Sequence, residues 1–185
     1  KPVGFKADAA GSVDGGSRAD SIRPPGRERI GAELDRLHAL EDVRALKHRY
    51  LRCLDTKQWQ EFEDCFVPEA TGDYNGLVFD DRAALVAYMR THMGPGLISL
   101  HQAHHPEVEV HGELATGRWY LQDKVIVAEH GFMLEGAAIY DDRYVRTPQG
   151  WRIAHTGYRR TYEATYRLAD LPGLRVRGPG EHTHV

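Results

Sequence analysis

Histidines and an aspartate in the middle of the chain are the residues best suited to acid–base chemistry. If residues 119–127 form a β-strand, alternate residues share one face, and Asp123 then lies among Trp119, Leu121, Val125 and Val127. An ionised carboxylate among apolar side chains needs a partner, because burial disfavours its charged form. Suitable partners precede it in the chain, at His101, His104 and His105.

A turn at residues 111–113 would let the histidine segment and the Asp123 segment pair as antiparallel strands. A histidine held by a carboxylate can accept a proton and return it. We therefore predict a general-base pair of His101 and Asp123. A structural alternative fits the same pattern, in which Asp123 pairs with an arginine or caps a loop.

A metal centre is the main chemical alternative, because histidine clusters bind zinc and iron. Strand alternation divides the four central histidines between two faces, and no zinc motif such as H-E-x-x-H is present; the four are His101, His104, His105 and His111. We therefore expect neither a metal ion nor any other cofactor.

Composition and charge exclude several classes of protein. The 185 residues are enough for one domain with a hydrophobic core. The formal net charge of -3, from 24 basic and 27 acidic residues, gives no electrostatic reason to expect nucleic-acid binding. No apolar run approaches the roughly 20 residues that cross a bilayer, and no secretory signal is evident. We expect a cytoplasmic protein with two free thiols, Cys53 and Cys65.

The chain divides into three parts by composition. Residues 1–28 have few large apolar side chains and much Gly, Ser, Asp and Pro, which predicts a disordered or extended arm. The sequence Pro24-Pro25-Gly26 marks its boundary. Residues 29–167 form the predicted domain, and residues 168–185 form an irregular tail.

Helices precede strands in the predicted domain. Apolar residues at three- and four-residue steps predict a helix from Ile30 to Asp55, with shorter helices at residues 58–66 and 81–93. Segments rich in Val, Ile, Tyr, Trp and Thr predict strands at residues 70–74, 98–105, 107–111, 115–128, 131–146 and 150–162. This order predicts an α+β fold, a cone-shaped α+β barrel in which the N-terminal helices pack over a long, curved, mostly antiparallel sheet around an apolar cavity.

Four phrases carry a resemblance to a known family, in the same order and at compatible spacing. They are Leu54-Asp55-Thr56-Lys57-Gln58-Trp59, HQAHHPEVEV at residues 101–110, ATGRWYLQD at residues 115–123, and Thr156-Gly157-Tyr158-Arg159-Arg160. From about Leu34 to Glu163 the chain resembles the SnoaL-like branch of the nuclear transport factor 2-like superfamily. Scytalone dehydratase and bile acid 7α-dehydratase are members of that superfamily.

The resemblance implies a catalytic set of Tyr50, His101, Asp123 and Arg160. We expect further contacts with substrate from Asp55, Tyr74, His105, Trp119 and Tyr140. Strand alternation places His105 on the face of His101 and His104 on the opposite face. It places Arg160 on one face with Thr156 and Tyr158, although a β-bulge would exchange it for Arg159.

These residues predict a cofactor-independent dehydratase, a lyase that removes water from a hydrophobic cyclic hydroxy-carbonyl compound of steroid or polyketide type. His101 would take the proton beside the carbonyl, and Tyr50 would donate a hydrogen bond to the enolate or the leaving hydroxyl. The same groups would serve a polyketide or terpenoid cyclase or an isomerase, and a non-catalytic binding module would need only the cavity. The resemblance also implies a homo-oligomer, either a dimer or a trimer.

Overall fold

The order of the elements confirms the predicted α+β fold. The structure, a computed structural model, describes residues 26–178. Its helices and strands are α1 (Arg27–Thr56), α2 (Trp59–Glu63), β1 (Phe66–Tyr74), β2 (Leu77–Phe79), α3 (Arg82–His92), β3 (Leu97–His111), β4 (Leu114–Val127), β5 (Phe132–Thr147) and β6 (Gly150–Arg167). Two short 3₁₀ helices follow β4 and β6, at Ala128–His130 and Leu168–Asp170.

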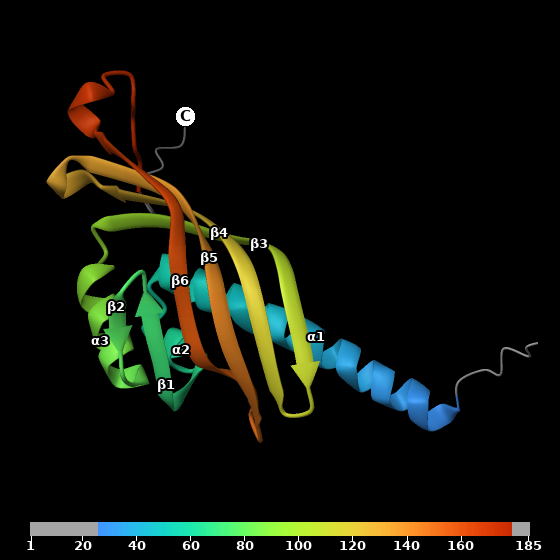
Figure 1. Cartoon of the computed structure of the whole chain (residues 1–185). Coiled ribbons are helices and arrows are strands. Elements are labelled where there is room, and N and C mark those ends of the chain that lie inside the picture. The colour runs from blue at the N-terminus through green and yellow to red at the C-terminus, as the bar shows by residue number, and fades with distance from the viewer. Residues whose placement is uncertain (1–25, 179–185) are drawn as a thin grey trace, which may run out of the picture.

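One curved, six-stranded sheet forms the body of the domain, in the order β2-β1-β6-β5-β4-β3. All neighbouring strands are antiparallel except β1 and β6, which are parallel. The long strands curve over α1, and α2 and α3 lie near β1 and β2 (Figure 1). This is the cone-shaped arrangement expected, with β3 at the open edge of the sheet beside α1.

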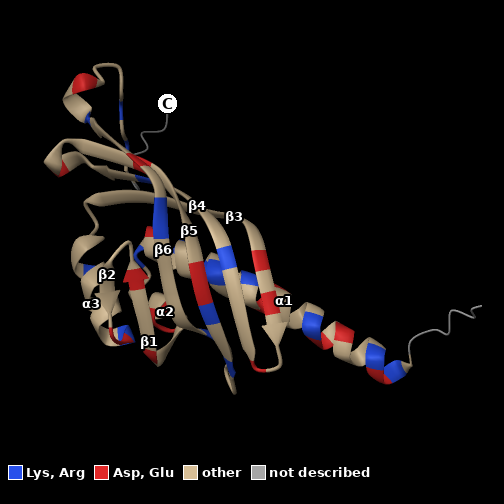
Figure 2. Cartoon of the chain, in the orientation of Figure 1, with Lys and Arg blue, Asp and Glu red and all other residues tan. Residues whose placement is uncertain are grey.

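Helix α1 is buried over only part of its length. Its C-terminal half packs on the sheet through residues at three- and four-residue steps, including Val43, Leu46, Tyr50 and Leu54. The N-terminal half extends beyond the sheet and carries charges of both signs (Figures 1 and 2). The residues that position chemistry therefore come from the last four turns of this helix.

Strand β3 is continuous where the sequence predicts two strands. A β-bulge interrupts its pairing with β4 between His104 and Glu107, so that two residues of β3 oppose the single residue Trp119. His105 adopts the left-handed conformation there, with φ of 45°, directly before Pro106. The bulge shifts the alternation of the strand, because Ala103 before it and Val108 after it both pack against the core.

Two predicted boundaries need correction. The second helix ends at Glu63 and not at residue 66, and the first strand begins at Phe66 and not at residue 70. Short strand β2 was not predicted; it pairs with β1 beyond a turn at Asn75 and Gly76. Helix α1 begins at Arg27, so the end of the predicted arm is helical, while residues 1–25 of that arm and residues 179–185 of the tail lie outside the described residues.

Candidate acid–base site

His101 and Asp123 lie opposite each other on neighbouring antiparallel strands, as predicted. His101 of β3 pairs in register with Asp123 of β4, which in turn pairs with Gly136 of β5. Only 9% of the His101 side chain and 3% of the Asp123 side chain are exposed. The three residues form one row across the sheet, so two titratable side chains are placed side by side in a largely buried setting.

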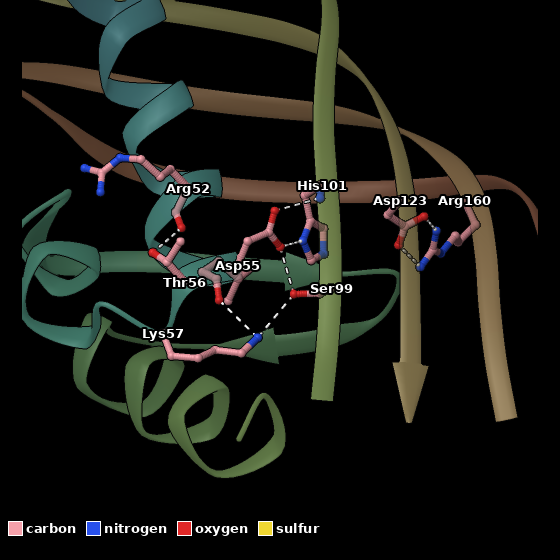
Figure 3. Close-up of polar contacts among 9 residues, drawn as sticks. Arg52, Asp55, Thr56, Lys57, Ser99, His101, Asp123 and Arg160 are labelled. Atoms are coloured by element: carbon pink, nitrogen blue, oxygen red, sulfur yellow. Dashed lines mark hydrogen bonds and ion pairs between the residues drawn. The ribbon is translucent and has the colours of Figure 1, made fainter. Parts of the chain in front are cut away.

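The ring of His101 binds Asp55, not Asp123 (Figure 3). Nδ1 of His101 lies 2.6 Å from Oδ1 of Asp55, near the end of α1. The backbone N–H of His101 donates a second hydrogen bond to Oδ2 of the same carboxylate, at 2.9 Å. The predicted partner of the histidine is therefore wrong: α1 approaches the free edge of β3 closely enough for its aspartate to hold both the ring and the backbone of His101.

Asp55 is held in place by further donors. The hydroxyl of Ser99 donates to Oδ1 of Asp55 at 2.8 Å, and Nζ of Lys57 donates to the Ser99 hydroxyl at 3.2 Å. Burial alone would raise the pKa of Asp55, but the hydrogen bonds and charge of His101, with the Ser99 hydroxyl, lower the pKa of this carboxyl below its usual value. Asp55 is thus a carboxylate oriented toward one imidazole nitrogen.

The position of Asp55 is unfavourable for the helix itself. The last turn of α1 contains Asp55 and no basic residue, although the partial negative charge at a helix C-terminus disfavours a carboxylate. Lys57, in the left-handed conformation with φ of 60°, ends the helix, and burial lowers the pKa of its ammonium group against the opposing effect of Asp55. The contacts with His101 and Ser99 compensate the unfavourable end of the helix.

Asp123 instead binds Arg160 of β6 through two hydrogen bonds (Figure 3). The distances are 2.6 Å from Nη1 to Oδ1 and 2.8 Å from Nη2 to Oδ2. Burial alone would lower the pKa of Arg160, but the hydrogen bonds and charge of Asp123 raise the pKa overall. The structural alternative for Asp123, an arginine partner, is therefore the one observed. Arg159 is mostly exposed and pairs with Asp73.

Gly136 provides the space for this ion pair. A Cβ atom at this position would lie 2.8 Å from Nη1 of Arg160 and 2.7 Å from the carbonyl oxygen of Tyr162. Any larger residue would push the guanidinium away from Asp123. The glycine thus links the row across the sheet to the position of an arginine three strands away from His101.

A groove of about 400 Å³ lies between α1 and β3 beside the His101–Asp55 pair. Its lining comes from one face of the helix and four consecutive residues of the strand: His48, Leu51, Arg52, Asp55, His101, Gln102, Ala103 and His104. Nε2 of His101 has no hydrogen-bond partner among residues 26–178. The second ring nitrogen therefore remains available to a molecule in the groove.

Four residues expected at the site lie in the hydrophobic core: Tyr50, Tyr74, Trp119 and Tyr140. The hydroxyls of Tyr50 and Tyr74 are 2.8 Å apart and hydrogen-bond each other, and the indole N–H of Trp119 donates to the hydroxyl of Tyr144. None of the four lines the groove. This geometry supports neither the expected catalytic role of Tyr50 nor the expected substrate contacts of the other three.

His105 does not lie on the face of His101 as expected, whereas His104 pairs with the exposed Tyr120 on the opposite face, as predicted. His105 is exposed, and its ring lies edge-on to the exposed ring of Tyr120 at 6.1 Å. His104 is half-buried and lines the groove together with His101. The bulge explains the error at His105, because simple alternation of faces fails where β3 contains an extra residue.

Sequence reasoning missed a buried ion pair beneath these aromatic residues. Nζ of Lys47 lies 2.8 Å from Oδ2 of Asp142, and both side chains are fully buried. Asp142 also accepts hydrogen bonds from Tyr144 and Thr156, and the ammonium group lies 3.3 Å from the centre of the Tyr140 ring. The sequence did contain a signal for the burial of Lys47, since this residue shares the apolar face of α1 with Tyr50 and Leu54.

The residues around His101 were also only partly found. Ser99 could have been recognised, since it lies two residues before His101 and alternation places both on one face. His48 has no such signal, because it is exposed on α1 and its relation to β3 depends on the packing of the helix. Within residues 26–178, no three His, Cys, Asp or Glu side chains are arranged to hold a metal ion, and no helix is long and apolar enough to span a membrane.

A family model described as "SnoaL-like domain" matches residues 35–157, which is most of the chain and includes Asp55, His101 and Asp123. The chain belongs to the SnoaL-like family. Among curated relatives, uncharacterized proteins of Mycobacterium tuberculosis and Mycobacterium bovis are 27% identical over 115 residues, covering 60% of this chain and 78% of the relative.

Solved structures share the fold of this SnoaL-like domain. A type 2 hexachlorocyclohexane dehydrochlorinase, LinA, superposes with a TM-score of 0.69 at 17% identity, over 80% of this chain and 99% of that chain. A putative scytalone dehydratase from Novosphingobium aromaticivorans gives 0.65 at 16% identity, over 84% and 99%. A protein of unknown function from Mycobacterium tuberculosis gives 0.63 at 25% identity, over 80% and 83%.

Proposed function

We propose that this SnoaL-like domain is a cofactor-independent lyase, a dehydratase that eliminates water from a hydrophobic cyclic hydroxy-carbonyl compound. The observation that carries the proposal is the His101–Asp55 pair. Nδ1 of His101 lies 2.6 Å from the carboxylate, while Nε2 has no partner within residues 26–178 and the residue borders a groove. An imidazole oriented on one side and open on the other is the arrangement a general base requires.

The proposed reaction uses His101 twice. Its neutral Nε2 takes the proton from the carbon next to the substrate carbonyl, and the electrons of that C–H bond form an enolate. The C–O bond to the leaving hydroxyl then breaks as the carbon–carbon double bond forms. The imidazolium returns its proton to the departing oxygen, so that water leaves and His101 is neutral again. Asp55 holds Nδ1 as the N–H and stabilises the imidazolium between the two steps.

Asp123 supports this chemistry indirectly in our proposal. It lies beside His101 in the register of the sheet, where an unpaired carboxylate would compete with Asp55 for the imidazolium. Its bidentate pair with Arg160 neutralises that charge. We therefore assign Asp123 and Arg160 as positioning residues. Tyr50 has no catalytic role in this scheme, because its hydroxyl binds Tyr74 inside the core.

The choice of elimination as the reaction is supported by two structural neighbours. One is named as a dehydrochlorinase and the other as a putative scytalone dehydratase, and both names describe elimination of a small molecule. At their low sequence identity, the similarity of these structures to this chain supports the fold alone, so the reaction class is our proposal. It agrees with the base that the geometry provides, since elimination next to an activating group needs one well-placed proton acceptor.

The test is proton exchange and water loss in heavy water, with a panel of steroid and polyketide β-hydroxy ketones analysed by mass spectrometry. We expect deuterium uptake beside the carbonyl together with loss of water. His101→Ala should lower turnover about 10²-fold or more, and Asp55→Asn should lower it strongly through loss of ring orientation. Circular dichroism of each variant checks that the fold is intact.

His111→Ala is the matched control. His111 lies on the same strand and contacts Glu109, but both side chains are largely exposed and neither borders the groove. Its turnover should equal that of the unchanged protein. Wild-type turnover in His101→Ala would overturn the proposal. Exchange without loss of water would instead indicate an isomerase or cyclase that uses the same base.

A further inference from the structure

A lysine ends helix α1 in a backbone conformation that glycine adopts more easily. Lys57 lies in the left-handed region, with φ of 60° and ψ of 30°. The Cβ atom of an L-residue makes this conformation costly, and glycine is the usual residue at the end of a helix for that reason. The chain itself has Gly131 in the same position after the 3₁₀ helix Ala128–His130, with φ of 67°. A strained lysine at the end of α1 therefore indicates a use for its side chain.

The side chain of Lys57 reaches two oxygen atoms. Its Nζ donates to the hydroxyl oxygen of Ser99 at 3.2 Å and to the carbonyl oxygen of Leu54 at 3.3 Å. The bond to Leu54 only satisfies an end of the helix, which water can also do. The bond to Ser99 joins the end of α1 to the strand that carries His101 (Figure 3).

Ser99 continues this contact to Asp55. A hydroxyl has one proton to donate, and an ammonium group only donates. Because Lys57 donates to the oxygen of Ser99, the hydroxyl proton is directed to Oδ1 of Asp55, 2.8 Å away. The same Oδ1 lies 2.6 Å from Nδ1 of His101. The hydrogen bonds thus form one chain from Lys57 through Ser99 to the carboxylate oxygen that orients His101.

We infer that Lys57 is a positioning residue for the base: through Ser99 it holds the Asp55 carboxylate against Nδ1 of His101. Without Lys57, the hydroxyl of Ser99 could rotate and donate to water, and Oδ1 of Asp55 would lose one of its two donors. The last turn of α1 has no basic residue to replace it. The inference rests on the proposed function, since it concerns the base of that reaction, and it explains why a strained lysine stands where glycine would be comfortable.

Lys57→Gly separates this role from a purely structural one. Glycine adopts φ of 60° without strain, so the free energy of unfolding in urea should not fall, whereas turnover in the heavy-water assay should fall about tenfold. Lys57→Met keeps the strain and the apolar stem and should lower turnover to the same degree. Lys124→Met is the matched control, because Lys124 is also partly buried and pairs with Glu135 at 3.2 Å. Its turnover should equal that of the unchanged protein.

The proton on Nδ1 of His101 gives a second readout that needs no substrate. Its NMR signal, assigned with isotope-labelled histidine as the one lost in His101→Ala, reports how fast the proton between His101 and Asp55 exchanges with solvent. We expect exchange to be about fivefold faster in Lys57→Met and in Ser99→Ala, as for the loss of one hydrogen bond. Ser99→Thr retains the hydroxyl and should restore the slower rate.

Unchanged proton exchange in Lys57→Met would overturn the inference, and so would absence of this proton signal from the unchanged protein. Turnover of Lys57→Gly at the level of the unchanged protein, or a loss of its stability that accounts for its lower turnover, would also overturn it. Faster exchange in Lys57→Met, in a protein that turns over no member of the substrate panel, would uphold the positioning role and count against the lyase. Turnover with unchanged proton exchange in Lys57→Met would do the reverse.

Discussion

Two polar pairs, each with one carboxylate, hold α1 to the sheet, and they differ in what surrounds them. Lys47 and Asp142 lie in the core, where neither side chain is exposed and the carboxylate has three partners. Asp55, nearer the C-terminal end of α1, and His101 lie at the open edge of β3 beside a groove. Both pairs join the same helix to the same sheet, but one ring nitrogen of the second pair has no partner within residues 26–178.

The difference shows that burial of charge does not by itself mark a catalytic group. A fully buried ion pair such as Lys47–Asp142 contributes mainly to stability and specificity of the fold, and no molecule can reach it. A general base needs one oriented nitrogen, one free nitrogen and space for a substrate. Within the described residues His101 meets these three conditions, and Lys47, despite its lowered pKa from burial, meets none of them.

The largest expected effect on stability comes from breaking the buried Lys47–Asp142 pair. Lys47→Met leaves Asp142 as an uncompensated buried charge and should lower the free energy of unfolding by about 3–5 kcal/mol. Urea denaturation measures this change. The double variant Lys47→Met with Asp142→Asn should recover a large part of the loss, because no buried charge remains. A loss below about 1 kcal/mol in the single variant would mean that this pair behaves like an exposed one.

Breaking the Asp123–Arg160 pair should also lower the stability, but by less. Asp123→Leu leaves Arg160 partly buried, with Glu163 at 3.4 Å as its one counter-ion within residues 26–178, and should cost about 3 kcal/mol of stability. Adding Arg160→Met should restore stability toward that of the unchanged protein. If Asp123→Leu alone were stabilising, the ion pair would not be the partner that Asp123 requires, and a direct pairing with His101 would have to be reconsidered.

Gly136→Ala should have a smaller effect on the same ion pair. The added Cβ would lie under 3 Å from the Tyr162 carbonyl oxygen and from Nη1 of Arg160, so backbone and guanidinium must move. We expect a loss of about 1–3 kcal/mol, as for other overpacked positions. Denaturant unfolding measures it. Gly112→Ala is an unsuitable control because of its positive φ, whereas Gly31→Ala, with open space around its Cβ, should not destabilise the protein.

The order of elements was predictable because apolar periodicity and turn residues are local properties of the sequence. The placement of His101 opposite Asp123 was predictable for the same reason, since strand alternation and a short turn determine it. The partner of His101 could not be predicted in this way, because the approach of Asp55 depends on how α1 packs across the edge of β3. The exposed position of His105 depends on one bulge residue, which alternation cannot locate.

The smallest expected effect is on the pH dependence of stability, which should distinguish the Asp55–His101 pair from the buried Lys47–Asp142 pair. The pKa of Asp55 is lowered in the folded protein, so the unfolded chain binds more protons than the folded one near pH 4. Its contribution to stability is therefore complete above the ordinary aspartate pKa and is lost as pH falls through the lowered folded value. Asp55→Asn should cost about 1 kcal/mol at pH 7, and its unfolding free energy should converge with that of the unchanged protein in acid. Urea titrations between pH 3 and 7 measure both curves; parallel curves would mean that Asp55 is not ionised against His101, and the base would lose its orienting charge.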